Sequence, residues 1–188
     1  MGRIIAGAAV GTRLRSVPGT GTRPTTDRTK EALFSWLDAR DWLADTVVAD
    51  LFAGSGALGL EAASRGAREV TLVERERRAV EVCRANAALV NRSLGRSAVR
   101  VQPGPVERFL EAAGADTVDL ILADPPYPLE GPGLDRVLAA AAITLTAGGL
   151  LMLERATRSV APARPESLEE VDVKTYGETR LYFWQDTR

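Results

Sequence analysis

Two short motifs in this 188-residue chain combine residue types that can do chemistry. The first is a glycine-rich stretch, Gly54-Ser55-Gly56, with a third glycine at Gly59. The second is Asp124-Pro125-Pro126-Tyr127. The chain has no histidine, which excludes a Ser-His-Asp triad, histidine metal ligands and imidazole acid-base catalysis. Any catalysis must therefore proceed without imidazole.

The glycine stretch has the spacing of a dinucleotide-binding fingerprint. Gly54, Gly56 and Gly59 follow a short apolar run, and Glu74 lies 18 positions after Gly56 at the end of a second run. In this pattern the glycines allow a tight turn and a close ligand, and the carboxylate accepts hydrogen bonds from ribose hydroxyls. The pattern predicts a cofactor that contains adenosine. It does not separate a nicotinamide dinucleotide from S-adenosylmethionine, because both present an adenosine to the same strand ends.

Asp50, just ahead of the glycine stretch, has two interpretations. Its carboxylate can hold the ammonium group of the cofactor's amino-acid part. It can equally fix the backbone of the glycine loop by accepting a hydrogen bond. The sequence leaves both open.

The Asp-Pro-Pro-Tyr motif suits chemistry on an exocyclic amine. The lone pair of such an amine is delocalised into the nucleobase ring, so the nitrogen needs orientation before it can attack. The Asp124 carboxylate and the Pro125 carbonyl can accept the two amine protons and aim the lone pair at a sulfonium methyl. Tyr127 can stack on the base, and the prolines stiffen the turn. Asp-Pro-Pro is more often a rigid capped turn, but its place after a strand, with a glycine loop upstream, favours methyl transfer.

The elements that must position these motifs alternate between strand and helix patterns. Apolar runs of strand length occur at 47–49, 70–73, 99–101, 120–123, 150–153, 171–173 and 180–184. Helical patterns occur at 57–65, 77–89, 106–113 and 134–142. The alternation predicts an α/β fold with a doubly wound, mostly parallel, Rossmann-like sheet and ligand at the carboxyl ends of its strands. Cys83, Trp36 and Trp184 are expected to pack in the core.

Residues 1–30 are expected to form a basic N-terminal extension ahead of a methyltransferase domain at 31–188. The extension has six basic residues and one acidic residue, a net charge of +5, so the remainder carries −6. Strand-like pieces at 4–6 and 13–15 and a loop at 18–24 predict a hairpin and loop. Thr25 or Thr26 is expected to cap a helix that carries Leu33, Trp36 and Leu37 on one face.

The basic extension indicates a localised contact with a polyanion, although a solvated arm would have the same composition. Arg28 can alternatively pack inward near the cofactor. The candidate residues for this polyanion contact are Arg3, Arg13, Arg15, Arg23 and Arg28.

Composition narrows the class further. The net charge is −1, and 45% of the residues are hydrophobic and 26% charged, as in ordinary globular proteins. One cysteine, Cys83, allows no internal disulfide and no cysteine zinc cluster. No apolar run approaches the length of a membrane span, and the first residues lack a secretory pattern. We expect a cytoplasmic protein that uses neither a membrane nor a metal.

Taken together, the two motifs and the Arg23–Phe34 and Gly56–Glu61 stretches resemble the RsmD family of class I S-adenosylmethionine-dependent methyltransferases. The resemblance covers nearly the whole chain and implies methyl transfer to the N2 amine of a guanine in 16S ribosomal RNA. The substrate would be RNA alone or RNA within a small-subunit assembly particle. The implied catalytic residues are Asp124, Pro125, Pro126 and Tyr127. The candidate cofactor residues are Asp50, Phe52, Ala53, Gly54, Ser55, Gly56, Leu58, Glu74, Arg75 and Val106.

One position departs from the wider class, in which an acidic or polar residue after the third strand binds the adenine amine. Here the chain reads Gly104-Pro105-Val106, so a backbone group of Val106 would have to serve. Glu61, in the first helix after the glycine loop, can order that loop or pair with an arginine of the extension.

Three other functions fit parts of the sequence. An adenine-N6 or cytosine-N4 amino-methyltransferase acting on DNA or RNA would use the same turn on another base. An NAD(P)-dependent oxidoreductase would explain the glycine loop but not the proline turn. A non-catalytic RNA-binding module would have no chemical need for Asp124 and Glu74.

Overall fold

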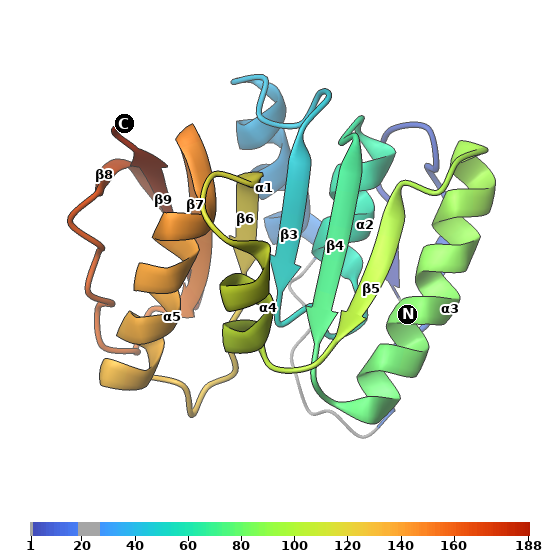
Figure 1. Cartoon of the computed structure of the whole chain (residues 1–188). Coiled ribbons are helices and arrows are strands. Elements are labelled where there is room, and N and C mark those ends of the chain that lie inside the picture. The colour runs from blue at the N-terminus through green and yellow to red at the C-terminus, as the bar shows by residue number, and fades with distance from the viewer. Residues whose placement is uncertain (1, 19–26) are drawn as a thin grey trace.

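Seven strands form one sheet in the order β5-β4-β3-β6-β7-β9-β8 (Figure 1). The computed structural model describes residues 2–18 and 27–188. The first five strands in this order pair in parallel, and β9 and β8 add two antiparallel strands at one side. The strands are β3 (Val47–Leu51), β4 (Glu69–Glu74), β5 (Val99–Pro103), β6 (Val118–Ala123), β7 (Leu145–Ala156), β8 (Leu168–Tyr176) and β9 (Thr179–Asp186). The predicted doubly wound, mostly parallel sheet is confirmed.

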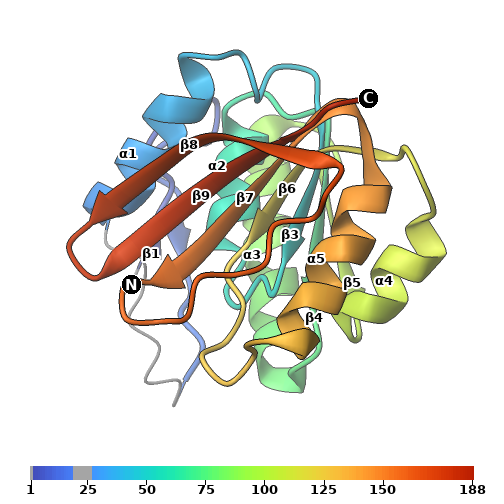
Figure 2. The ribbon, with the colours of Figure 1, turned by 90° about the vertical axis from the view of Figure 1, so that its left-hand side faces the viewer.

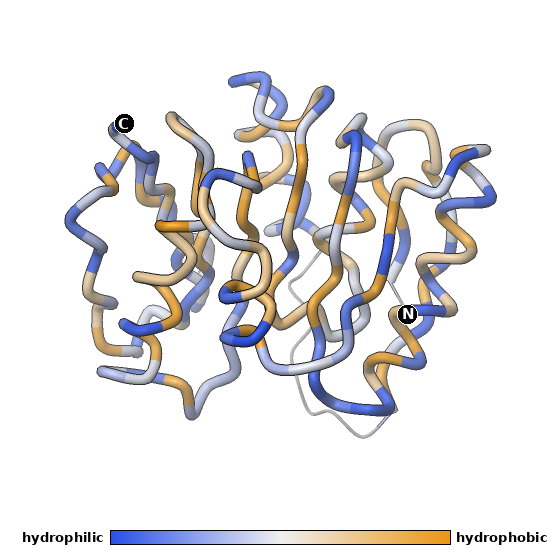
Figure 3. Tube along the Cα trace, in the orientation of Figure 1, coloured by the Kyte–Doolittle hydropathy of each residue, from blue (hydrophilic) through white to orange (hydrophobic). Residues whose placement is uncertain are grey.

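Helices cover both faces of this sheet, as Figure 2 shows from the side. Helices α1, α2 and α3 lie on one face, and α4 and α5 lie on the other. Their bounds are α1 (Asp27–Asp38), α2 (Ala57–Ser64), α3 (Arg77–Leu94), α4 (Val106–Ala113) and α5 (Pro132–Thr144). Because strand side chains alternate between faces, β6 sends Leu120 and Leu122 to one hydrophobic cluster and Ile121 to the other. Figure 3 shows the resulting apolar middle of the central strands.

Several predicted bounds were too short, for identifiable reasons. Helix α3 continues past residue 89 to Leu94, where Gly95 ends it with a φ of 66°. Its last turns are more polar, so the apolar pattern fades before the helix does. Strand β8 runs from 168 to 176 because its backbone pairs with β9 along that length, although most of its side chains are exposed. Apolar patterning marks buried residues and misses strand residues at an edge.

The N-terminal extension begins with the predicted hairpin, whose first strand lies earlier in the chain than expected. β1 (Gly2–Arg3) pairs with β2 (Arg13–Leu14). The strand expected at 4–6 was wrong, because β1 ends at Arg3. The N–H groups of Ile5 and Ala6 donate instead to the Glu61 carboxylate of α2, at 2.8 and 3.0 Å. The predicted loop and helix cap at 19–26 lie outside the described residues.

The extension packs against the body. Ile4, Ala9 and Leu14 are each at most 2% exposed and belong to the cluster beneath α1, α2 and α3. The buried Glu61 also pairs with Lys30 at 3.5 Å and with Arg65 at 2.9 Å. Among the described residues, Glu61 has neither predicted role: it secures the backbone of the extension and pairs with a lysine of that segment.

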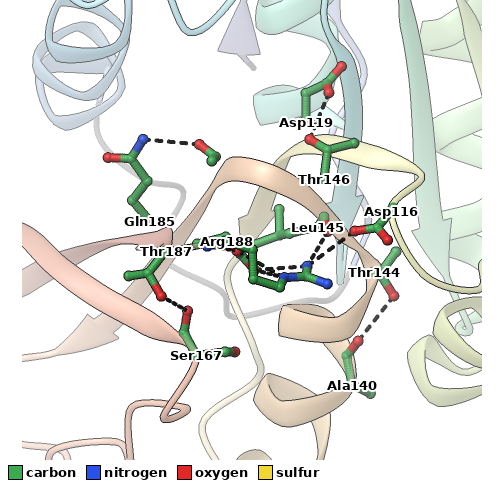
Figure 4. Close-up of polar contacts among 12 residues, drawn as sticks. Asp116, Asp119, Ala140, Thr144, Leu145, Thr146, Ser167, Gln185, Thr187 and Arg188 are labelled. Carbon is green, nitrogen blue, oxygen red and sulfur yellow. Dashed lines mark hydrogen bonds and ion pairs between the residues drawn. The ribbon is translucent and has the colours of Figure 1, made fainter.

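Polar contacts link the amino ends of the strands, and Figure 4 draws several of them. Arg188 donates to the Asp186 carboxylate and to the Leu145 carbonyl, and it pairs with Asp116. Asp119 accepts from the N–H of Val47 at 2.8 Å and from the Thr146 hydroxyl at 2.9 Å. These contacts join the beginnings of β3, β6 and β7 at the edge opposite the predicted site.

Within residues 2–18 and 27–188, no helix is long and apolar enough to cross a membrane. Trp36 and Trp184 pack in the core as predicted, and Trp36 stacks on Phe183 with a ring-centroid separation of 3.9 Å.

Candidate active site

The two motifs meet at the point where the strand order reverses. After β3 the chain adds β4 and β5 to one side of the sheet, and β6 and β7 extend it on the other. The last residues of β3 and β6, Leu51 and Ala123, are register partners. The glycine loop follows the first and Asp124 follows the second, so both lie at the carboxyl edge. This is where doubly wound sheets bind ligands.

The glycine loop has a backbone that only particular residues allow. Gly54 and Gly56 have φ values of 57° and 82°, a region that favours glycine. A Cβ at Gly59 would lie 2.4 Å from a methyl of Leu72 and 3.0 Å from Cβ of Asp50, so glycine is required where α2 crosses the sheet. Phe52 also has a positive φ, 63°, which is unusual for a bulky residue and common at functional sites.

Glu74 lies beside this loop at the end of β4, where a ribose-binding carboxylate was predicted. Its Oε2 accepts from the Gly54 N–H at 2.8 Å. Its Oε1 accepts from the N–H groups of Arg75 and Glu76, each at 2.8 Å. The carboxylate is therefore fixed in place against the glycine loop by three backbone donors.

Two side chains of α3 hold the glycine loop through hydrogen bonds. Asn86 is fully buried; its amide donates to the carbonyls of Ser55 and Arg15 and accepts from the Arg15 N–H. The Cys83 thiol donates to the Gly54 carbonyl at 3.1 Å. Cys83 is buried as predicted. Sequence reasoning did not single out Asn86, although a lone polar residue on the apolar face of this helix was a usable signal.

Asp50 fixes backbone, one of its two predicted roles. Its Oδ2 accepts from the Gly59 N–H in α2 at 2.8 Å. Burial raises the pKa of Asp50 to about 7, against the lowering effect of that hydrogen bond, and the charges of Asp124 and Glu74 raise it further. Three carboxyl groups thus share one small region at the carboxyl edge.

Asp124 begins the turn that was predicted to be catalytic. Desolvation by the protein around its carboxyl raises the pKa of Asp124 to about 6, and the positive charge of Arg155 lowers it. The residue still presents part of its surface to solvent at the edge of the sheet. Pro125 is buried, and Tyr127 is 60% exposed. A large aromatic side chain left in solvent beside a carboxylate is available for stacking on a planar ligand.

Two arginines that the sequence analysis missed flank this turn. Arg155, at the end of β7, donates to the Pro125 carbonyl at 3.4 Å and to Glu130 at 3.0 Å. The Arg158 guanidinium lies 5.1 Å from the centroid of the Tyr127 ring. Both arginines come after the apolar residues of β7. Two arginines directly after a buried strand were the signal that the sequence offered.

The remaining candidate cofactor residues lie along the same edge. Ala53 and Ser55 are half-buried in the loop, and Arg75 is exposed. The Leu58 side chain is buried in the core, so only its backbone is left for the predicted contact with the cofactor. Val106 begins α4 after β5, and its side chain is buried. Its N–H is one of the first-turn donors that a helix leaves unpaired, so the predicted backbone contact to adenine remains a prediction.

The candidate RNA residues are exposed wherever they are described. Arg3, Arg13 and Arg15 lie on the extension, and Arg28 lies in the first turn of α1. The inward alternative for Arg28 is not observed. Arg23 lies outside the described residues. In the parts of the chain that the structure covers, no cluster of three or more histidine, cysteine, aspartate or glutamate residues could hold a metal ion.

The fold and its edge are those of a class I methyltransferase, and solved structures agree. The Escherichia coli protein yhhF is 30% identical, with a TM-score of 0.83 over 99% of this chain and 98% of its own. A hypothetical protein from Thermus thermophilus is 33% identical, with a TM-score of 0.78 over 97% and 98%.

Sequence comparison gives the family. The model of the family described as Conserved hypothetical protein 95 matches residues 2–185. The chain is 39% identical to YlbH of Bacillus subtilis over 127 residues and 39% identical to Ribosomal RNA small subunit methyltransferase D of Escherichia coli over 125 residues. Each match spans 66% of this chain, and 66% and 60% of these relatives. The chain belongs to this family, the RsmD family, as its motifs indicated.

Proposed function

We propose that this protein transfers a methyl group from S-adenosylmethionine to the N2 amine of a guanine in 16S ribosomal RNA. One observation carries the choice of cofactor: Asp50, Glu74 and Asp124 gather at the same edge of the sheet, close enough that the charges of Glu74 and Asp124 raise the pKa of Asp50. Such a site favours a positively charged ligand. S-adenosylmethionine carries a sulfonium and an ammonium group, whereas a nicotinamide dinucleotide would bring a pyrophosphate to the same carboxylates.

The residues present fit this cofactor. Glu74, fixed beside Gly54, would accept from the ribose hydroxyls. Asp50 would face the ammonium group, and the Val106 N–H would serve the adenine. When bound, the cofactor supplies a methyl group on a sulfonium. The protein's part is to hold the target amine in line with that methyl.

The Asp124–Tyr127 turn would hold the amine. The Asp124 carboxylate and the Pro125 carbonyl accept its two N–H groups, so the nitrogen lone pair points away from both. The exposed Tyr127 ring stacks on the base. A base inside a duplex cannot reach this turn, so the guanine must be flipped out or already unstacked.

The names of the family's relatives support ribosomal RNA as the substrate class. Adenine-N6 and cytosine-N4 transfer would use the same turn, so the guanine assignment needs a product test. Labelled S-adenosylmethionine should be incubated with the protein and, in parallel, naked 16S RNA, small-subunit particles and DNA. The labelled nucleosides should then be separated. We expect N2-methylguanosine; N6-methyladenine or N4-methylcytosine would contradict the guanine assignment.

The exposed arginines of the extension are proposed to hold phosphates around the target base. Replacing Arg13 and Arg15 by glutamine should flatten the dependence of single-stranded RNA binding on salt. The log–log slope should fall by about 0.7 for each phosphate that the protein no longer binds. Arg92, in the last turn of α3, is the matched control. An unchanged slope for the double variant would move the RNA surface elsewhere.

A further inference from the structure

Arg155 is a buried cation beneath the catalytic turn. Its side chain is 3% exposed. It projects from the end of β7 on the face covered by α5, since Leu151 and Leu153 of the same strand belong to that cluster. Strand β7 is the neighbour of β6, with Leu153 in register with Ala123. This places Arg155 next to the residues that follow Ala123.

The guanidinium joins both ends of the loop that carries the turn. Nη1 donates to the Pro125 carbonyl at 3.4 Å, and Nη2 donates to Glu130 Oε1 at 3.0 Å. Pro125 lies at the start of the β6–α5 loop and Glu130 near its end. A planar guanidinium can span two such acceptors in a fixed geometry, which a lysine cannot do. The Pro125 carbonyl keeps a second lone pair for a substrate N–H.

Stability does not explain this arginine. Its Nε is buried with no hydrogen-bond partner among the described residues. A buried donor without a partner is costly, and an apolar side chain of similar volume is often as stable or more so. A costly residue kept beneath an active site points to a functional requirement.

The charges around Asp124 show what that requirement is. Asp50, in β3, lies close enough for its charge to interact with those of Asp124 and Glu74. Glu154 is buried on the other face of β7, and Glu130 is engaged by Arg155 itself. Arg155 is the cation whose charge lowers the pKa of Asp124, opposing the desolvation of the carboxyl group that raises it.

We propose that Arg155 is a positioning residue for methyl transfer: it clamps the 124–131 loop through Pro125 and Glu130 and keeps the Asp124 carboxylate ionised. The inference rests on the function proposed above. It assigns two separable tasks to one side chain, a geometric one for the guanidinium fork and an electrostatic one for its charge.

Two substitutions separate these tasks. Arg155→Met removes the fork and the charge, whereas Arg155→Lys keeps the charge and loses the fork. Arg180→Met is the matched control, because Arg180 is the register partner of Arg155 on β9 and is half-buried. The rate of methyl transfer to 16S RNA should be measured from about pH 5.5 to 9, a range that spans the titration of a carboxyl with a raised pKa, at saturating cofactor and RNA.

Since the ionised Asp124 carboxylate is a stronger acceptor for the amine than the neutral carboxyl group, the rate should rise with pH through the pKa of Asp124. Without the nearby cation, this rise should move to higher pH by about one unit. At about pH 6, Arg155→Met should therefore lose about fivefold from the lower ionised fraction of Asp124, in addition to the loss from the missing fork, and it should recover the fivefold part by about pH 9. Arg155→Lys should be slower at every pH, with the rise at the wild-type position. Arg180→Met should keep the wild-type profile.

A uniform fall in rate for Arg155→Met, with no movement along the pH axis, would overturn the electrostatic task. A wild-type rate for Arg155→Lys would overturn the geometric one. If the methionine variant does not fold, Arg155→Gln takes its place with the same expectation.

A second measurement does not depend on the reaction. The Asp124 carboxyl carbon can be followed by NMR in protein labelled with ¹³C-aspartate and assigned with Asp124→Asn. Its midpoint should rise in Arg155→Met and stay constant in Arg180→Met. If the wild type methylates no RNA but the midpoint still moves, the proposed function fails and the electrostatic part of the inference stands. If the midpoint stays fixed while the wild type methylates RNA, the proposed function stands and the electrostatic part of the inference fails.

Discussion

The two edges of the sheet differ in the environments of their carboxyl groups. At the amino edge, two carboxylates have close partners. Arg188 holds Asp186, and its hydrogen bonds lower the pKa of that carboxyl. Asp119 accepts from the Thr146 hydroxyl, as Figure 4 shows, and from the Val47 N–H. At the carboxyl edge, the pKa values of Asp50 and Asp124 are raised to about 7 and about 6.

The difference indicates which carboxyl groups stabilise the folded state and which destabilise it. A carboxyl group with a lowered pKa stabilises the fold when ionised, whereas one with a raised pKa opposes folding at neutral pH. One strand connects the two edges: Asp119 lies at the beginning of β6, and Asp124 follows its last residue. We infer that the amino edge stabilises the sheet, and that the carboxyl edge keeps charges available for a cationic ligand.

The largest effect should come from Asp124. Asp124→Ala should fold and bind S-adenosylmethionine but lose roughly 10³-fold in the rate of methyl transfer, since the amine loses its main acceptor in the transition state. Single-turnover kinetics with saturating RNA measures this. Asp119→Ala on the same strand is the control and should keep its rate per folded molecule. Near-normal turnover of Asp124→Ala would remove the distinction between the two ends of β6.

Asp50 should reveal the stability cost directly. Because its pKa is raised when folded, from 3.8 to about 7, its penalty is absent below about pH 4 and complete above about pH 7. Asp50→Asn keeps an acceptor for the Gly59 N–H and removes the charge. It should raise the free energy of unfolding by about 2 to 4 kcal/mol at about pH 8 and by little at about pH 4.

Urea unfolding at the two pH values tests this, and calorimetry should show weaker cofactor binding by the same variant. A stability gain that does not depend on pH would mean that the Asp50 charge is not its cause.

Glu74 should contribute to affinity. Glu74→Ala should weaken S-adenosylmethionine binding by about 1 to 3 kcal/mol, because charge-assisted hydrogen bonds to the ribose and the anchor of Gly54 are removed together. Glu69, exposed at the amino end of the same strand, supplies the control Glu69→Ala. Equal affinities for both variants, measured by calorimetry, would exclude Glu74 from the cofactor site.

The smallest expected effect is at Asp119. Asp119→Ala leaves the Val47 N–H without its acceptor and should lower the free energy of unfolding by about 1 to 2 kcal/mol. Its affinity for S-adenosylmethionine should match the wild type within about twofold. Asp119→Asn keeps one acceptor and should lose less stability. A loss of affinity without a loss of stability would show that the amino edge also acts on the site.

Local sequence determined the fold class and the two motifs. Alternating strand and helix periods specify a parallel sheet because each buried strand needs helices on both faces. Gly54 and Gly56 are dictated by their backbone angles, which are a local constraint, whereas Gly59 is dictated by the close approach of α2 to Leu72 and Asp50. The spacing of the three glycines was nevertheless enough to place the loop. The bounds that failed, in α3 and β8, are those where backbone hydrogen bonding continues after the apolar pattern stops.

The tertiary structure alone decided which distant residues support the site. Asn86 reaches Ser55 and Arg15, and Arg155 reaches Pro125, only because the helix and strand that carry them pack beside the motifs. It also decided that Glu61 fastens the extension, since its buried carboxylate finds backbone donors 55 and 56 residues away. Propensity and periodicity describe neighbours along the chain, whereas hydrogen bonds and charge interactions depend on distance in space. The motifs could therefore be recognised in the sequence, and the side chains that hold and tune them could be identified only in the fold.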